Sequence, residues 1–353
     1  MGINYYAPIN STGYGIASLN ILKELYKLEN SNLYYFPIGS PSVSSQHDYD
    51  FIKLLLSRSI NFDPADPCIK IWHQFDLATR VGNGKYIAYP FFELDTFNDL
   101  EKKHLTVPDV LIASSNWAKQ IFINNGLSTE IHVVPLGVDL SIFDHQLANF
   151  QNNKYVFLTI GKWEIRKGHD LLPDIFKKAF PTESDVELWI VAAEHTNGYS
   201  KPEEINAWKK MYNHDRIKVI PGVGSHSEIA QLIANSSCGL YVSRAEGWNL
   251  ELLETMAMNK PVIATNYSAH TEFCNPENCL LVDINDTEPA HDGKAFHGQG
   301  HWAKIGQDQI DQTIQYMRYV YNNKINTNLA GLKTAQEYSW QNSAECLYGC
   351  INI

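Results

Sequence analysis

The chain has 353 residues, a length that suits two domains rather than one core. Its hydrophobic content of 44% and charged content of 19% are those of a globular protein. The net charge of −11 argues against a nucleic-acid partner, which would require a basic face, and lowers without excluding docking to anionic lipid. The chain starts without the pattern of a signal peptide, and no apolar stretch approaches the ~20 residues that span a bilayer. We therefore expect a cytoplasmic protein without a transmembrane segment, and contact with the cytoplasmic membrane face stays open.

Strand-like and helical patterns alternate through the first half of the chain, as in a doubly wound α/β domain. The predicted elements are a strand at 3–8, a helix at 16–27, a strand at 33–36, a helix at 51–57, strands at 69–72, 85–91 and 110–114, a helix at 117–125 and a strand at 131–135. Gly13, Tyr14 and Gly15 lie in the loop before the first helix, where glycines let the backbone approach a ligand closely. Most turns of this kind hold no ligand, so the signal is weak by itself.

Two side chains in this half directly follow strands. His73 follows the strand at 69–72, and Glu93 follows the strand at 85–91. The carboxyl ends of the strands form the ligand-binding edge of an open α/β sheet, so both residues are candidates for a pocket. A purely structural histidine explains the position of His73 equally well.

The polar, Asn-rich segment at 144–153 is predicted to be an interdomain linker, after which a second α/β pattern begins. The elements predicted there are strands at 155–160, 186–192, 217–221, 239–243, 261–265 and 280–282, and helices at 203–212, 227–235, 250–258, 309–321 and 329–337. The tail from 338 continues as a helix through Leu347.

No segment has the pattern of a metal site. Asp48-Tyr49-Asp50 has the form of a DxD motif, but it opens a helix instead of following a buried strand. The segment 287–306 contains three histidines but no acid or cysteine at a fixed spacing, and we predict an exposed loop. The pairs Cys274–Cys279 and Cys346–Cys350 lack the companion CxxC that a zinc site requires, so all six cysteines are expected to be free buried thiols.

Residues 239–266 predict a buried strand, a sharp turn, a helix and a second buried strand. Glu246 leaves the first strand, and Glu254 lies one turn into the helix, for which Asn249 is a suitable N-cap. The free amides at 248–250 face outward from the helix N-terminus, which attracts a phosphate. Carboxylates accept hydrogen bonds from pairs of sugar hydroxyls, so an anion site between two acids suits a nucleotide sugar. An ordinary crossover with two solvated acids fits the spacing equally well.

Two motifs resemble retaining glycosyltransferases of the GT-B fold, specifically the group-one family (glycosyltransferase family four). The first consists of Glu246 and Glu254 with seven residues between them, within EGWNLELLETMAMNKPVIATN. The second is GKWEIRKG at 161–168, which matches the family's glycine, basic residue, short spacer and Lys-Gly. PLGVD at 135–139 resembles the family's interdomain junction. The resemblance covers nearly the whole chain and is densest from 155 to 283.

The resemblance implies an α/β fold of the GT-B class, in which two Rossmann-like domains face each other across a cleft. Residues 1–147 would form the acceptor-binding domain, with the C-terminal helix at about 338–353 packing back on it. Residues 153–337 would form the domain that binds the nucleotide sugar.

The resemblance also implies roles for the matched residues. Catalytic roles fall to His73, Glu246 and Lys167, and the acceptor contact to Glu93. Donor-binding roles fall to Gly13, Tyr14, Gly15, Lys162, Arg166, Lys167, Val223, Gly247, Trp248, Asn249, Leu250 and Glu254. Among these, Glu254 would bind the ribose and Val223 the base. Lys162 and Lys167 would neutralise the diphosphate, and Arg166 is the next candidate for that role. The sequence departs from the family at Asn249, where glycine is usual, and at Lys162, where lysine keeps the charge of arginine but loses its bidentate geometry.

The implied function is transfer of a sugar from a nucleotide-diphosphate sugar, with UDP or GDP expected, to a hydroxyl of a saccharide or lipid-linked acceptor. The anomeric configuration would be retained, and neither a metal nor a cofactor is expected. Two alternatives stay open: a GT-B sugar-nucleotide epimerase, and a non-catalytic protein that binds nucleotide sugars or carbohydrates. A nicotinamide-dependent Rossmann enzyme is disfavoured, because GxGxxG is absent after the first strand.

Overall fold

The computed structural model describes residues 2–29, 32–147, 153–192 and 202–351. The chain divides into two compact units, the N-terminal unit (Met1–Gly137 with Tyr338–Ile353) and the C-terminal unit (Val138–Glu337). This division lies ahead of the polar segment at 144–153, of which residues 148–152 lie outside the described residues. Within the part of the chain described, no helix is both long enough and apolar enough to cross a membrane.

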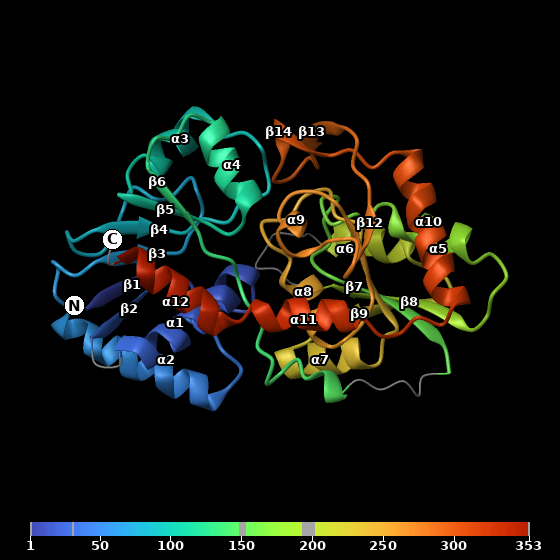
Figure 1. Ribbon diagram of the computed structural model, residues 1–353, viewed down its shortest axis with the longest axis horizontal. Coiled ribbons are helices and arrows are strands. Elements are labelled where there is room, and N and C mark those ends of the chain that lie inside the picture. The colour runs from blue at the N-terminus through green and yellow to red at the C-terminus, as the bar shows by residue number, and fades with distance from the viewer. Residues whose placement is uncertain (1, 30–31, 148–152, 193–201, 352–353) are drawn as a thin grey trace. The chain divides into compact units, whose positions relative to one another are not determined.

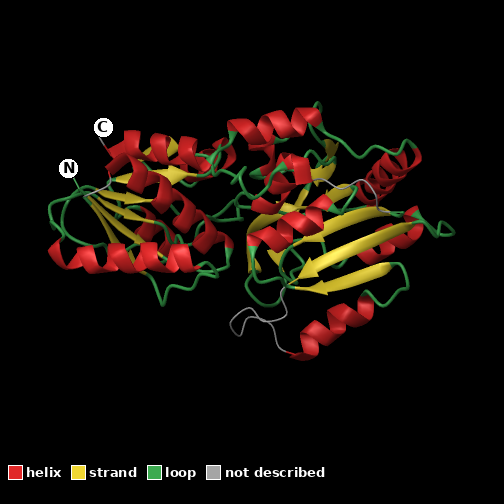
Figure 2. Cartoon of the chain, turned by 90° about the horizontal axis from the view of Figure 1, so that it is seen from below, coloured by secondary structure: helices red, strands yellow, loops and turns green. Residues whose placement is uncertain are grey.

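The N-terminal unit is built on a six-stranded parallel sheet with helices on both faces (Figures 1 and 2). Its strands, in spatial order, are β2 (Leu33–Pro37), β1 (Ile3–Ala7), β3 (Cys68–Lys70), β4 (Tyr86–Ala88), β5 (Val110–Ala113) and β6 (Glu130–Val133). Its helices are α1 (Gly13–Glu29), α2 (Gln46–Arg58), α3 (Asp99–Leu105), α4 (Asn116–Asn124) and α12 (Trp340–Ile351), and a 3-10 turn covers Ser59–Asn61. Strands β3, β4 and β5 are buried throughout, as parallel strands covered on both faces must be.

Some elements of this unit differ from the sequence prediction. Helix α1 begins at Gly13, so the Gly-Tyr-Gly segment forms its first turn instead of a loop. Strand β4 ends at Ala88, so Phe91 lies in the segment that leads to Glu93. Asp48 lies in the first turn of α2, where its Oδ1 pairs with Lys23 Nζ at 2.6 Å.

The last helix, α12, packs against α1 within the N-terminal unit. Ser343 Oγ donates a hydrogen bond to the carbonyl of Pro135 at 2.7 Å. A Cβ atom on Gly137 would lie 2.3 Å from the carbonyl carbon of Ser339. Glycine is therefore required at this point of the PLGVD segment, because the backbone entering α12 presses against it.

The C-terminal unit is built on a second six-stranded parallel sheet. Its strands, in spatial order, are β12 (Leu280–Val282), β11 (Val262–Thr265), β10 (Cys238–Tyr241), β7 (Tyr155–Ile160), β8 (Val186–Ala192) and β9 (Ile217–Pro221). Its helices are α5 (Leu172–Ala179), α6 (Pro202–Met211), α7 (His226–Ala234), α8 (Leu250–Ala257), α9 (His270–Phe273), α10 (Gln307–Asn322) and α11 (Leu329–Glu337), and a 3-10 turn covers His145–Leu147. The buried faces of β7, β8, α5 and α10 form its hydrophobic core.

The segment predicted as an exposed loop at 287–306 is instead an antiparallel hairpin of β13 (Thr287–His291) and β14 (His297–Ala303). The high Gly and His content concealed the alternation that a strand requires. Trp302 of β14 is buried and Ala290 of β13 is buried, so the hairpin contributes to the packing of the unit. All six cysteines are free thiols, but Cys346 is exposed, contrary to the expectation that all of them are buried.

Each sheet has one point where the order of its strands reverses. In the N-terminal unit the chain runs outward from β1 to β2 and then returns to place β3 on the other side of β1. In the C-terminal unit it runs outward from β7 to β9 and then returns to place β10 beside β7. Open α/β sheets bind ligands outside the carboxyl ends of their strands at such a switch point. The fold therefore predicts ligand sites at the carboxyl ends of β1 and β3 in one sheet, and at the carboxyl ends of β7 and β10 in the other.

Candidate functional site

At the switch point of the N-terminal unit, Tyr14 is held between several aromatic rings. Its hydroxyl donates to the carbonyl of Phe91 at 2.7 Å and accepts from the amide of Phe91 at 2.8 Å. Its ring centroid lies 4.6 Å from that of His73, and the His73 ring stacks on Phe75 at 4.9 Å. Burial raises the pKa of Tyr14 well above its ordinary range, and the charge of nearby Glu93 raises it further. The fold thus brings Tyr14, His73 and Glu93 together.

The two glycines that flank Tyr14 differ in how much space a side chain would find there. A Cβ atom on Gly15 would lie 2.2 Å from the backbone nitrogen of Asn10, so this glycine is required by the close approach of two backbone segments. A Cβ atom on Gly13 would meet nothing within 4 Å, and Gly13 is exposed. Only Gly13 therefore leaves open space in front of the first turn of α1.

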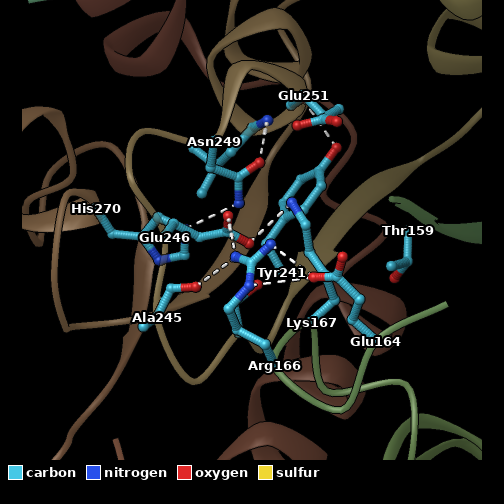
Figure 3. A network of polar contacts seen from close by, with 12 residues as sticks. Thr159, Glu164, Arg166, Lys167, Tyr241, Ala245, Glu246, Asn249, Glu251 and His270 are labelled. Atoms are coloured by element: carbon cyan, nitrogen blue, oxygen red, sulfur yellow. Dashed lines mark hydrogen bonds and ion pairs between the residues drawn. The ribbon is translucent and has the colours of Figure 1, made fainter. Parts of the chain in front are cut away.

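At the switch point of the C-terminal unit, cations after β7 meet a carboxylate after β10 (Figure 3). Arg166 Nη1 lies 2.8 Å from Glu246 Oε2, and Lys167 Nζ lies 2.9 Å from Glu246 Oε1. These two turns are 80 residues apart in the chain at Arg166 and Glu246, and the pairing of β7 with β10 brings them together. Glu246 is 4% exposed, so the contacts occur in a largely dehydrated environment.

Burial and neighbouring charges act in opposite directions on the pKa values of Glu246 and Lys167. Burial by itself would raise the pKa of Glu246, but Lys167 and Arg166 outweigh it and lower the pKa to about 2. Burial would lower the pKa of Lys167, but the charges of Glu246 and Glu251 raise it. Glu246 and Lys167 are therefore both ionised at neutral pH.

Asn249, the departure from the family pattern, takes the backbone conformation for which glycine is usual. Its φ is +81°, in the left-handed region, and its side-chain Oδ1 accepts a hydrogen bond from the amide of Leu252 at 3.2 Å as the N-cap of α8. Asn tolerates this conformation better than most residues with a side chain. The Asn249 Nδ2 group lies 2.9 Å from Nε2 of His270.

His270 is buried and has both ring nitrogens engaged. Its Nδ1 lies 2.9 Å from the carbonyl oxygen of Thr265, which can only accept, so Nδ1 carries the proton. Nε2 is then an acceptor for the Asn249 amide. Burial lowers the pKa of His270, which agrees with a neutral ring. Neither His270 nor its link to Asn249 was predicted, since they are 21 positions apart and no local pattern connects them.

Glu254 differs from Glu246 in having no counter-ion among the described residues. It is 7% exposed, and no described residue donates a hydrogen bond to its carboxyl group. Burial, together with the charge of Glu251, raises the pKa of Glu254 well above its ordinary range. A buried carboxyl group without a partner is costly to the protein, so this position is suited to a ligand that supplies the hydrogen bonds.

Other candidate residues lie at the same edge of the sheet with different environments. Lys162 is exposed at the start of the turn that follows β7 (residues 161–168, the basic turn). Trp248 is buried, with its ring 4.9 Å from that of Phe273, and Leu250 is buried at the start of α8. Val223 follows the edge strand β9 and is separated from the switch point by β8.

Sequence reasoning did not single out Arg244, which joins the basic turn to the hairpin. Its Nη1 and Nη2 lie 2.8 Å from the two carboxylate oxygens of Asp170, and its Nε lies 3.3 Å from Glu288 Oε1 on β13. It also donates to the carbonyl of Ile165 at 2.5 Å. Its position directly after a buried strand could have marked Arg244 as a site residue. Its partners Asp170 and Glu288 could not be predicted, because they are distant in sequence. Across the described ranges, no group of three His, Cys, Asp or Glu residues could hold a metal ion.

Sequence comparison finds similarity to known proteins in the C-terminal unit. Residues 154–292 match the family of glycosyl transferases group 1. The MMP alpha-(1->4)-mannosyltransferase of Mycolicibacterium hassiacum is 28% identical over 172 residues, which make up 48% of this chain and 40% of that protein. The chain thus spans less than half the length of this curated relative.

Solved structures extend the similarity to the whole chain. Sucrose-phosphate synthase from Thermosynechococcus elongatus has a TM-score of 0.71 and 13% identity, covering 100% of this chain and 98% of that chain. HepE from Anabaena, solved in complex with UDP and glucose, has a TM-score of 0.69 and 14% identity, covering 100% of both chains. These comparisons confirm the resemblance to group-one glycosyltransferases and the GT-B fold class predicted from the sequence.

Proposed function

Because residues 154–292 match the family of glycosyl transferases group 1, we propose that the protein transfers a hexosyl group from a nucleoside-diphosphate sugar to a hydroxyl group. The acceptor is a saccharide or glycolipid, and the anomeric configuration is retained. One observation carries the proposal. Lys167 and buried Glu246 meet at the switch point of the C-terminal sheet beside the N-terminus of α8, and that helix carries the carboxyl group of Glu254, which has no partner among the described residues.

The donor is proposed to lie along the C-terminal edge of this sheet. Lys167, Lys162 and the backbone amides at 247–250 bind the diphosphate, because a helix N-terminus and cations both favour an anion. Glu254 accepts hydrogen bonds from the ribose hydroxyls, which satisfies its buried carboxyl group. Glu246 orients the transferred sugar, and the turn at Val223 contacts the base.

The proposed chemistry needs no nucleophilic carboxylate. The bond between the anomeric carbon and the phosphate oxygen breaks, and the electron pair leaves with the diphosphate. The acceptor oxygen forms its bond on the same face, and its proton passes to the departing phosphate oxygen. Lys167 and the amides stabilise the charge that develops on the leaving group, so electrostatic stabilisation and positioning supply the rate enhancement.

The N-terminal unit is proposed to recognise the acceptor through Glu93. His73 is proposed as a catalytic residue that contacts the transferred sugar, and the Gly13–Gly15 turn as a donor contact. The tight packing of Tyr14 against His73 supports this assignment, because it fixes the imidazole at the ligand edge of the sheet. We further propose that the enzyme is cytoplasmic and requires neither a metal nor a cofactor.

Two relatives suggest candidate donors. HepE was solved with UDP and glucose, and the mycobacterial relative is named as a mannosyltransferase. UDP-glucose and GDP-mannose are therefore the first donors to test. A non-catalytic binding protein and a sugar-nucleotide epimerase are the alternatives.

A thermal-shift panel of UDP, GDP, ADP and dTDP, followed by the corresponding sugar nucleotides, tests the proposal. A bound ligand at a hundredfold excess over its Kd should stabilise the protein by about 2.7 kcal/mol. NMR of the reaction with an acceptor mixture then reports the product's anomeric configuration, with and without EDTA. Binding without turnover favours the binding protein, an epimerised donor favours the epimerase, and an inverted product contradicts retention.

A further inference from the structure

Arg166 was grouped with the cations expected to bind the donor, yet its guanidinium is already occupied by the protein. Nη1 donates to the Ala245 carbonyl at 2.7 Å and to Glu246 Oε2 at 2.8 Å. Nη2 and Nε donate to Glu164 Oε2 at 2.7 and 3.1 Å. All three nitrogens are therefore engaged, and Arg166 is 7% exposed.

The backbone of Arg166 is fixed as well. Its carbonyl accepts a hydrogen bond at 2.7 Å from the amide of Arg244, directly beyond β10. Arg166 thus joins the turn after β7 to the turn after β10 through both its side chain and its main chain (Figure 3). Most N–H groups of this guanidinium are therefore already satisfied by the protein, and a phosphate would have to compete for them with Glu164, Glu246 and the Ala245 carbonyl.

Lys167 is in a different position. Its ammonium shares Glu246 with Arg166, but it uses the other carboxylate oxygen, at 2.9 Å. The amine of a flexible side chain can turn from one anion to another, whereas the planar fork of Arg166 is held in one orientation by Glu164, Glu246 and the Ala245 carbonyl. Glu164, Arg166, Lys167 and Glu246 together carry two positive and two negative charges, so the cluster is neutral without a ligand.

We propose that Arg166 is a positioning residue, the permanent counter-ion of Glu246, which frees Lys167 to move to the donor diphosphate. Glu164 holds Arg166 in place from the opposite side. When Lys167 turns away, Glu246 keeps the bond through Oε2 and does not become an unpaired buried charge, which would be strongly unfavourable. This assignment rests on the proposed function for the role of Lys167, but the pairing of Arg166 with Glu246 can be tested without any substrate.

The experiment compares the wild-type protein with Arg166→Gln, Arg166→Lys and Glu164→Gln. Carbon-13 NMR of glutamate-labelled protein follows the titration of Glu246, assigned with Glu246→Gln, and calorimetry measures the affinity for UDP and GDP. The charged and titratable groups that face Glu246 are Lys167, Arg166 and His270. The Arg166 variants change only one of these three groups. Lys304→Gln is the matched control, because it removes one exposed cation from the same unit.

In Arg166→Gln we expect the Glu246 titration to move to higher pH by one unit or more, with nucleotide affinity within threefold of wild type. Arg166→Lys should recover part of the shift, and Lys304→Gln should show none. A tenfold or greater loss of UDP or GDP affinity in Arg166→Gln would identify a phosphate ligand and overturn the proposal, as would an unchanged Glu246 titration. If Arg166→Gln does not fold, Arg166→Lys decides by the direction of the Glu246 shift, which should again be to higher pH, with nucleotide affinity within threefold of wild type. Glu164→Gln, which loosens Arg166 without removing its charge, should likewise keep nucleotide affinity within threefold, and a tenfold loss in either variant would overturn the proposal. If no nucleotide binds the wild-type protein, the proposed function fails, while the titration still decides the role of Arg166.

Discussion

Asn249 and His270 form a side-chain pair that holds the turn between the two glutamates. The Asn249 amide meets His270 Nε2 at 2.9 Å, and the His270 Nδ1–H is anchored on the Thr265 carbonyl at 2.9 Å. The backbone of Asn249 has a φ of +81°. Where a glycine would leave this turn flexible, the chain places a side chain that caps α8 and ties the turn to the segment after β11.

The pair predicts different costs for two substitutions of Asn249. Glycine adopts positive φ freely and is a tolerable N-cap, so Asn249→Gly should lower the free energy of unfolding by less than about 1 kcal/mol. Alanine loses the cap and keeps the strain, so Asn249→Ala should cost about 2 kcal/mol. Urea denaturation of both variants measures the difference, and equal costs would mean that the backbone conformation is unimportant here.

Removal of Lys167 should affect turnover more than folding. Lys167→Ala takes away the cation that is proposed to stabilise the leaving diphosphate, and we expect kcat to fall by about 10²–10³. Arg166 still pairs with Glu246 in this variant, so the protein should fold. The matched control is Lys304→Ala, which removes an exposed cation of the same unit that has no proposed role in donor binding. An unaltered rate in Lys167→Ala would refute its role on the diphosphate.

Glu254 should make stability depend on pH in a known direction. Burial raises its pKa in the folded state above the unfolded value, so the folded protein holds this proton more tightly. The contribution of the group to stability is full below the unfolded pKa of about 4.3 and is lost as the pH rises through the folded pKa. Glu254→Gln removes this titration and should be more stable than the wild type at neutral pH. Denaturation at pH 4 and pH 7 should show the difference growing with pH, and a constant difference would contradict it.

The same residue tests the proposed ribose contact. Glu254→Ala removes both carboxyl oxygens and should weaken binding of the nucleoside diphosphate by up to about tenfold, since a hydrogen bond to a neutral group contributes about 0.5–1.5 kcal/mol. Calorimetry with UDP and GDP measures the change. The variant Glu251→Ala, one turn closer to the start of α8, is the comparison. Unchanged donor affinity in Glu254→Ala would refute the assignment.

Arg244 should hold the hairpin to the sheet edge. Arg244→Met leaves the half-buried Asp170 without its bidentate partner and releases Glu288 of β13, so we expect a loss of about 1.5–3 kcal/mol, as for hydrogen bonds to charged groups. Hydrogen exchange in β13 and β14 should increase more than in β7. The exposed pair of Lys304 with Asp286 is the control, and breaking it should cost at most about 1 kcal/mol. Equal losses from both variants would show that Arg244 is no more than a surface cation.

The sequence by itself determined the alternation of strands and helices and placed the chemical groups at strand ends. Glu246 lies in the turn after a buried apolar run, and Lys162 to Lys167 lie in the turn after another, because burial on both faces leaves a parallel strand continuously hydrophobic. The spacing of Glu246 and Glu254 is local, so it could be recognised without knowing any contact. By contrast, the hairpin at 287–303 was missed because its glycines and histidines conceal strand periodicity.

Only the tertiary structure decided which of these groups meet. Strand pairing depends on contacts between residues far apart in the chain, and hydrophobic patterns do not specify which strands are neighbours. The placement of β10 beside β7 turned Arg166 from a candidate phosphate ligand into the partner of Glu164 and Glu246. It also left Glu254 buried without a donor among the described residues. The sequence identified the charged groups, and the fold determined which charges are satisfied within the protein and which are left for a ligand.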